Sequence, residues 1–134
     1  MSLKRRINTH MRVNYQRIPH DRIIDAQFAL GNANCHHNAV AAVRAGRADA
    51  VWMVWAGHGD QGCVHFINSK EGKFFDETWH DESNRQDYYI IRKVRPDEYD
   101  DVYDLLVDCK WMLANLLATR WQRWRMKQDS HRYM

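Results

Sequence analysis

Four short runs of β-branched and aromatic residues, separated by turn residues, most constrain what this chain can fold into. The first three runs lie only a few residues apart, and connections that short join antiparallel neighbours. Pro96 closes the last run, because proline cannot donate to a sheet ladder. The sequence therefore predicts an antiparallel sheet of about four strands, over 51–55, 63–68, 73–78 and 88–94.

Helical patterns precede these strands. Asn34 is suited to cap a helix that begins at Cys35 and ends at Gly46. A shorter helix is expected over 21–28. The residues before it are expected to be irregular, with a short strand around 12–18.

A long helix is predicted to close the chain. Pro96 fits its first turn, and the carboxylates that follow suit the positive end of the helix dipole. Apolar residues then recur at three- and four-residue spacing from Val102 to Trp124, which indicates one buried face. That stripe is longer than a small sheet can cover, so we predict that part of it is buried in a homodimer.

The length and composition agree with a single domain. A chain of 134 residues with 45% hydrophobic content can bury one core and is too short for two. No run approaches the roughly 20 apolar residues of a membrane span, and polar residues follow the basic start where a signal peptide needs an apolar stretch. The three cysteines are an odd number without a CxxC pair, which disfavours a disulfide framework. We therefore expect a cytoplasmic protein with no membrane partner.

Cys35 is the main candidate for a nucleophile. A thiol reacts as the thiolate, and a helix N-terminus lowers its pKa through unpaired N–H groups and a partial positive charge. A histidine must then approach the sulfur, and a third polar residue must orient that histidine. His65 on the second predicted strand and Asp76 on the third are placed for these tasks.

The hairpin pattern places His65 and Asp76 on one face of the sheet. A four-residue turn over 69–72 sets them directly opposite each other, and a two-residue turn at Glu71-Gly72 makes them diagonal neighbours. Only an odd-length loop or a bulge would separate them.

These residues resemble the core of papain-like cysteine enzymes in their transglutaminase-like or cell-wall-peptidase arrangement. That core has a cysteine at a helix start, a histidine on the strand that begins a hairpin, and an Asp-x-Thr sequence on the return strand, here Asp76-Glu77-Thr78. The sequence Asn34-Cys35-His36-His37-Asn38 is also similar to a group of small bacterial and phage proteins with a Cys-His-x-Asn start. The likeness covers roughly residues 30–80.

The resemblance implies a role for each of these side chains. Cys35 is the expected nucleophile, His65 the general base and acid, and Asp76 the carboxylate that orients the histidine. An oxyanion hole would combine the backbone N–H of Cys35 with a supporting side chain, for which the candidates are Asn34, Asn32 and Gln27.

The implied function is hydrolysis or acyl transfer at an amide bond of a peptide or protein substrate, without a cofactor. The single domain then consists of a basic N-terminal segment, a papain-like core and the long C-terminal helix, over 1–20, 21–95 and 96–128. The fold expected is α+β, with the Cys35 helix packed on the antiparallel sheet. The alternative is a catalytically inactive binding or assembly protein of phage origin on the same fold.

Zinc and nucleic acid are the two other ligand classes for which the sequence offers side chains. The sequence contains many cysteines and histidines that could bind zinc, but the spacings usual in structural zinc sites are absent, so no metal site is predicted. Tryptophans next to arginines near the C-terminus could stack on the bases of a nucleic acid. The helical spacing of these tryptophans favours packing instead, so nucleic acid is not an expected partner. The zinc candidates are Cys35, His36, His37, His58, Cys63, His65 and His80, and the tryptophans are Trp111, Trp121 and Trp124.

Overall fold

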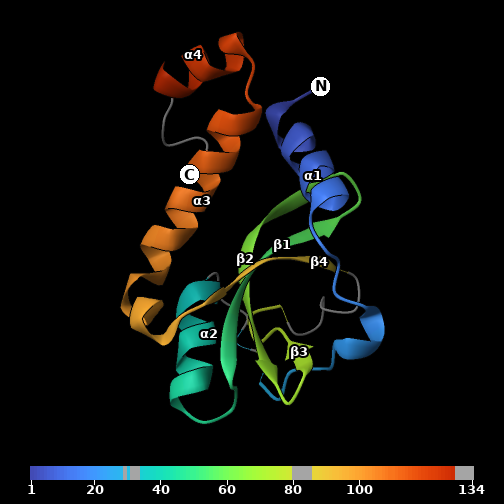
Figure 1. Cartoon of the computed structure of the whole chain (residues 1–134), viewed down its shortest axis with the longest axis vertical. Helices are drawn as coiled ribbons and strands as arrows, with labels where there is room; N and C mark the ends of the chain where they lie inside the picture. The colour runs from blue at the N-terminus through green and yellow to red at the C-terminus, as the bar shows by residue number, and fades with distance from the viewer. Residues whose placement is uncertain (29, 31–33, 80–85, 129–134) are drawn as a thin grey trace.

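The computed structural model describes residues 1–28, 30, 34–79 and 86–128. Its centre is an antiparallel sheet in the order β3-β2-β1-β4, with helices packed beside it (Figure 1). The predicted α+β class and four-stranded sheet are confirmed. The strands are β1 Ala50–His58, β2 Gln61–Lys70, β3 Lys73–Phe75 and β4 Asp87–Val94.

Two-residue turns set the register of the sheet. The turn Gly59-Asp60 joins β1 to β2, and Gly59 has φ +64. The turn Glu71-Gly72 joins β2 to β3, with φ 52 and 81, and positive φ at both central residues is typical of a type I′ hairpin. β3 is short, so it pairs with β2 only from Asn68 to Lys70.

The N-terminal segment forms a helix, α1 Leu3–Asn14, and the expectation of an irregular start with a strand around 12–18 is wrong. Ser2 caps this helix, because its Oγ accepts a hydrogen bond from the Arg5 N–H at 3.2 Å. Leu3, Ile7 and Met11 recur at four-residue spacing and turn toward the core. Beyond the helix, Arg17 forms an isolated bridge with Tyr89.

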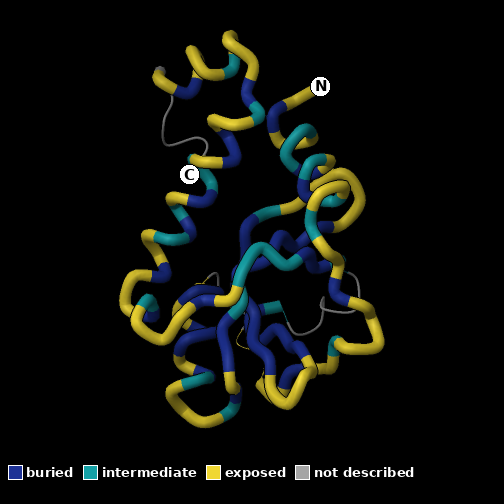
Figure 2. Tube along the Cα trace, viewed as in Figure 1, coloured by how far each residue is buried: buried dark blue, intermediate teal, exposed yellow. Residues whose placement is uncertain are grey.

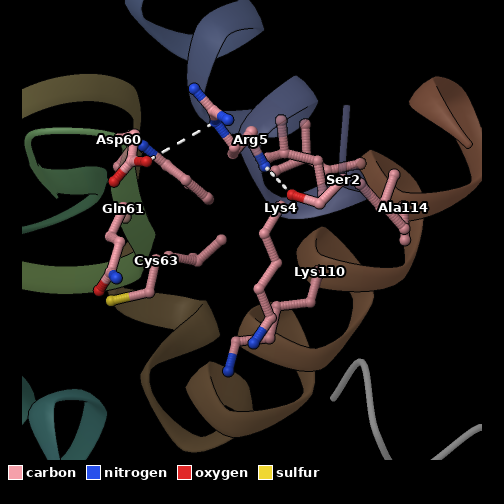
Figure 3. Close-up of a pocket in the computed structure, with 14 residues that line it drawn as sticks. Ser2, Lys4, Arg5, Asp60, Gln61, Cys63, Lys110 and Ala114 are labelled. Carbon is pink, nitrogen blue, oxygen red and sulfur yellow. Dashed lines mark hydrogen bonds and ion pairs between the residues drawn. The ribbon is translucent and has the colours of Figure 1, made fainter.

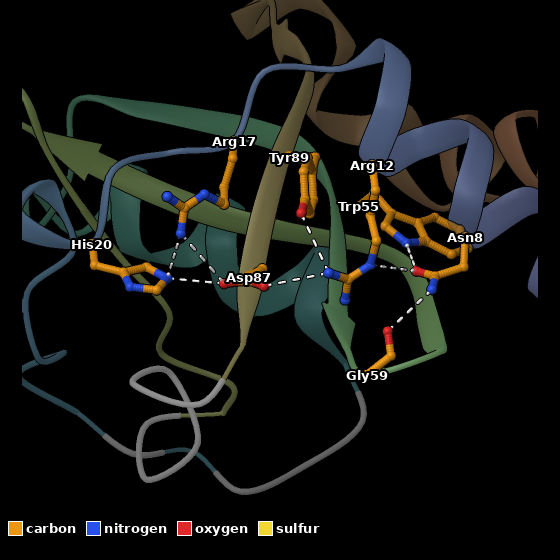
Figure 4. A network of polar contacts seen from close by, with 8 residues as sticks. All are labelled: Asn8, Arg12, Arg17, His20, Trp55, Gly59, Asp87 and Tyr89. Carbon is orange, nitrogen blue, oxygen red and sulfur yellow. Dashed lines mark hydrogen bonds and ion pairs between the residues drawn. The ribbon is translucent and has the colours of Figure 1, made fainter.

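A polar network fastens α1 to the sheet (Figure 4). The Asn8 Oδ1 accepts a hydrogen bond from the buried Trp55 Nε1 at 2.9 Å, and the Asn8 Nδ2 donates to the Gly59 carbonyl at 3.3 Å. Arg12 donates to Asp87 Oδ2 at 3.4 Å, and His20 contacts the other oxygen of Asp87 at 2.9 Å. The middle of α1 is thereby held beside the β1–β2 turn.

The helix predicted at Cys35 is present as α2 Cys35–Arg44. Gly46 follows it with φ +80, the left-handed conformation typical of a helix C-terminus. The shorter helix expected over 21–28 is wrong. A 3-10 turn, η1 His20–Arg22, stands there, and the Ile24 N–H then donates to the Phe74 carbonyl at 2.8 Å, which draws the chain into an extended path along β3.

The C-terminal region is helical, but the expected uninterrupted helix is broken. It consists of η3 Pro96–Asp101, α3 Val102–Leu117 and α4 Arg120–Gln128. Ala118 is extended, and Thr119 then starts α4 with a capping box. Its Oγ1 accepts from the Gln122 N–H at 3.2 Å, while Gln122 Oε1 accepts from the Thr119 N–H at 2.9 Å.

The core lies on both faces of the sheet. Residues of α1, α2 and α3 pack on one face against Met53, Trp55 and Phe66. The other face, with Val54 and Tyr88, is covered by Ile18 and its neighbours. Burial is therefore concentrated along the strands and α2, whereas much of α3 and α4 is exposed (Figure 2). In the described residues no helix combines the length and the apolar character needed to cross a membrane.

Candidate active site

Cys35 is the first residue of α2, with Asn34 before it, so its sulfur lies at the positive end of the helix. The residue is 8% exposed. The Phe66 N–H of β2 donates a hydrogen bond to the sulfur. That N–H is open to the cysteine because β3 ends before it reaches this part of β2, and alternate N–H groups of an edge strand point away from the sheet.

His65 lies beside Phe66 on β2 and links the cysteine to the carboxylate. Its Nε2 donates to Asp76 Oδ2 at 2.8 Å, and its side chain is also hydrogen-bonded to the Cys35 thiol. With Nε2 engaged, the nitrogen that faces the sulfur is Nδ1. The Trp79 ring is stacked on the imidazole with centroids 3.8 Å apart, so the histidine is held between a sheet and an aromatic cover.

Asp76 follows the last residue of β3 and turns the chain. Its Oδ1 accepts from the backbone N–H groups of Thr78 and Trp79 at 3.0 and 3.1 Å, an arrangement that bends the backbone away from the strand. Its Oδ2 accepts from His65 and from the Tyr88 hydroxyl at 2.7 Å. Four donors therefore satisfy a carboxylate that is 1% exposed.

The two residues after Asp76 attach this turn to α2 and to the segment that follows it. Glu77 accepts two hydrogen bonds from Arg47, at 2.8 and 3.1 Å, in the two-pronged geometry that suits an arginine and a carboxylate. The Asn38 side chain donates to Thr78 Oγ1 at 2.9 Å. The helix that carries the cysteine and the turn that carries the carboxylate are thus tied together.

The structure brings the three predicted residues together. The hairpin has the two-residue turn at Glu71-Gly72, so His65 and Asp76 are related diagonally, with Asp76 just beyond the strand end. Cys35 approaches from the open edge of β2. Their catalytic roles remain a prediction.

The charges of the three groups support one another. Burial raises the pKa of the Cys35 thiol, but the hydrogen bond and charge of His65 outweigh it, so that pKa lies below its usual value. Burial lowers the pKa of His65, yet Asp76 and Cys35 together raise it to about 9. Burial also opposes ionisation of Asp76, and His65 nevertheless holds the pKa of that carboxyl below its usual value. The site favours a thiolate, an imidazolium and a carboxylate in a row.

Two of the predicted supporting side chains, those of Gln27 and Asn34, lie at exposed positions. Gln27 is exposed and, within the described part of the chain, has no hydrogen bond to Cys35, His65 or Asp76. Asn34 is exposed at the N-cap position, where its side chain does not cap the first turn of α2. Asn32 lies outside the described residues. The backbone N–H of Cys35 stays the other predicted oxyanion donor, because first-turn N–H groups lack intrahelical partners.

Trp79 and Tyr88 are members of the site that sequence reasoning missed. Trp79 directly follows the Asp-x-Thr sequence, so its place next to Asp76 in the chain could have indicated that it belongs to the site. Tyr88 comes from β4, which pairs with β1, and its phenol crosses the face of the sheet to reach Asp76. That contact depends on the strand order β3-β2-β1-β4, which the sequence analysis did not predict.

Among the described residues, the histidines and cysteines do not converge as a metal centre. In the described ranges no group of three or more His, Cys, Asp or Glu side chains could hold a metal ion, and His80 lies outside those ranges. His36 is buried and His37 is exposed, with their rings 4.3 Å apart at the start of α2.

The chain has no match among the family models, the curated proteins or the solved structures with which it was compared. The functional interpretation therefore depends on the residues and on the geometry described above.

Proposed function

We propose that this protein is a thiol hydrolase or acyl transferase that cleaves an amide bond through Cys35, His65 and Asp76, as in the papain-like enzymes that its sequence resembles. The observation that carries the proposal is the hydrogen-bonded row from a thiol at a helix N-terminus, through a histidine, to a fully satisfied carboxylate.

The chemistry follows from the order of these groups. The Cys35 thiolate attacks the carbonyl carbon of a peptide or protein substrate, and the resulting oxyanion is stabilised by the Cys35 backbone N–H. The His65 imidazolium gives its proton to the leaving amine as the C–N bond breaks. Water, or an acceptor amine in a transferase, then attacks the acyl-enzyme while His65 takes a proton, and the thiolate leaves.

Asp76 acts through His65. Its carboxylate accepts the Nε2–H, fixes the ring so that Nδ1 faces the sulfur, and favours the charged imidazolium. Because the Tyr88 hydroxyl and two backbone N–H groups hold the carboxylate, the ring orientation is set before substrate binds.

A second candidate function is a catalytically silent binding or assembly protein on the same fold. The observation in its favour is burial: Cys35 is 8% exposed, and His65 and Asp76 are each 1% exposed. A buried ionic row is compatible with a structural role as well as with catalysis.

Alkylation by iodoacetamide separates the two. At pH 6.5 we expect Cys35 to react at least about tenfold faster than Cys63 or Cys109, because burial raises the pKa of both other thiols and that of Cys63 to about 11. Mass spectrometry of the peptides measures each rate.

Variants of the histidine and the carboxylate complete the test. His65→Ala should slow alkylation of Cys35 at pH 6.5 by about tenfold or more, because only the hydrogen bond from the Phe66 N–H then opposes the rise in thiol pKa that burial causes. Asp76→Asn should slow it less, and His10→Ala on α1 should leave it unchanged. Equal reactivity of all three cysteines would contradict the assignment of Cys35 as the nucleophile and would favour the binding-protein alternative.

A further inference from the structure

A cavity of about 550 Å³ lies between the start of α1, the middle of α3 and the β1–β2 turn (Figure 3). Its floor is apolar, formed by side chains such as Leu3, Trp55 and Leu113. Its volume is in the range of small-molecule and side-chain binding sites. The cavity is not part of the triad described above.

The walls of the cavity carry positive charge without an equal negative charge. Lys4 on α1 and Lys110 on α3 face each other, and Figure 3 shows their ammonium ends directed toward the same place. In the part of the chain that the structure describes, neither lysine forms an ion pair. The acidic residue of the lining is Asp60, which is 3.6 Å from the Arg5 guanidinium. Two ammonium groups held together in this way favour an anion between them.

The cavity adjoins the part of β2 that directly precedes the site histidine. Cys63 and Val64 line it, and they directly precede His65 in the strand. Burial raises the pKa of Cys63, the charge of Cys35 raises it further, and Lys110 lowers it. Cys63 therefore lies within electrostatic reach of both the reactive sulfur and the cavity lysine.

We infer that this cavity binds a carboxylate side chain of the substrate, so that the enzyme acts on acidic peptides. The apolar floor receives the methylene groups of a glutamate-like side chain, and Lys4 and Lys110 bind its carboxylate while the adjoining carbonyl lies at Cys35. This inference rests on the proposed function, because it assigns the cavity to the acyl group that Cys35 attacks.

Two matched alkylating probes test the assignment. One is the α-amide of N-iodoacetylglutamate and the other is the α-amide of N-iodoacetylglutamine, which differ only in a carboxylate and its amide. In each reaction the Cys35 thiolate displaces iodide. Mass spectrometry at pH 6.5 and low salt gives the rate at Cys35 for each probe, and their ratio reports the preference for negative charge.

The lysine variants then locate that preference. We expect the ratio to fall about fivefold in Lys4→Gln combined with Lys110→Gln, and to fall in the wild type as salt is added, because exposed ion pairs are weak and screened. Lys127→Gln, an exposed lysine on α4, should leave the ratio unchanged. The rate with the neutral probe shows that each variant still holds the thiol in its native site.

Each outcome has a distinct meaning. Should the ratio stay the same without the two lysines while Cys35 remains reactive, the acidic-peptide assignment is overturned and the proposed function stands. Should Cys35 be unreactive toward both probes in the wild type, the proposed function fails, and the assignment fails with it.

Discussion

Cys35 and His65 change the stability of the fold in opposite directions with pH. The pKa of His65 is raised from 6.5 to about 9, so its contribution to stability is fully present below pH 6.5 and is lost as the pH rises through about 9. The pKa of Cys35 is lowered, so its contribution is present above the thiol's ordinary pKa and is lost as the pH falls through the folded value. The proton that the thiol releases is, in effect, the one that the imidazole holds.

Removing the thiol should reveal the contribution of the histidine. We expect the free energy of unfolding of Cys35→Ala to fall by about 1 kcal/mol more than that of the wild type as the pH rises from 6.5 to 9, because Asp76 alone still raises the pKa of His65, although by less than in the wild type. Urea unfolding at half-unit steps of pH measures the two profiles. Cys109→Ala, which removes a buried thiol from α3, serves as the control. Parallel profiles for Cys35→Ala and the wild type would contradict the coupling.

At the scale of the elements, the part of the site that could be predicted is the part that depends only on the alternation of side chains along paired strands. His65 and Asp76 were expected to meet because either even-length turn keeps them on one face, and they do meet. The role of Phe66 was not predictable, because it follows from where β3 stops. The cap of α1 at Ser2 and the capping box at Thr119 were not predicted, because local signals of this strength compete with tertiary packing.

The break between α3 and α4 has a local cause that can be tested. Thr119→Ala removes the side-chain acceptor for the Gln122 N–H, and we expect it to destabilise α4 by about 1 kcal/mol. The free energy of opening measured by hydrogen exchange at the Gln122 and Arg123 amides should fall by a similar amount, while the amides of α3 stay protected. Thr9→Ala, at an exposed position of α1, is the matched control. Unchanged exchange in α4 would show that packing, and not the cap, defines its start.

At the scale of the whole molecule, the C-terminal helices leave large apolar side chains uncovered. Met112 and Trp124 are each 54% exposed, Leu116 is 61% exposed, and Trp121 is 63% exposed. The rings of Trp121 and Trp124 are stacked with centroids 5.1 Å apart. Patches of this kind mark interaction surfaces, which supports the prediction that part of the apolar stripe is buried against a second copy.

Light scattering tests that prediction directly. We expect the wild type to have the mass of a dimer and Leu116→Glu combined with Trp121→Glu to shift it toward the monomer, because a charge in an apolar interface is costly to desolvate. Val13→Glu, at a residue of α1 that is 75% exposed, should leave the mass unchanged. A monomer in the wild type at high concentration would rule the dimer out.

The shortness of β3 also affects how this protein resists aggregation. An edge strand with outward N–H groups is a template on which another chain can form a strand, and natural sheets cover or interrupt such edges. Here the sulfur of Cys35 occupies the outward N–H of Phe66 where β3 no longer protects β2. Cys35 therefore also blocks this part of the sheet edge, and a substituent on its sulfur would weaken the hydrogen bond that occupies the Phe66 N–H.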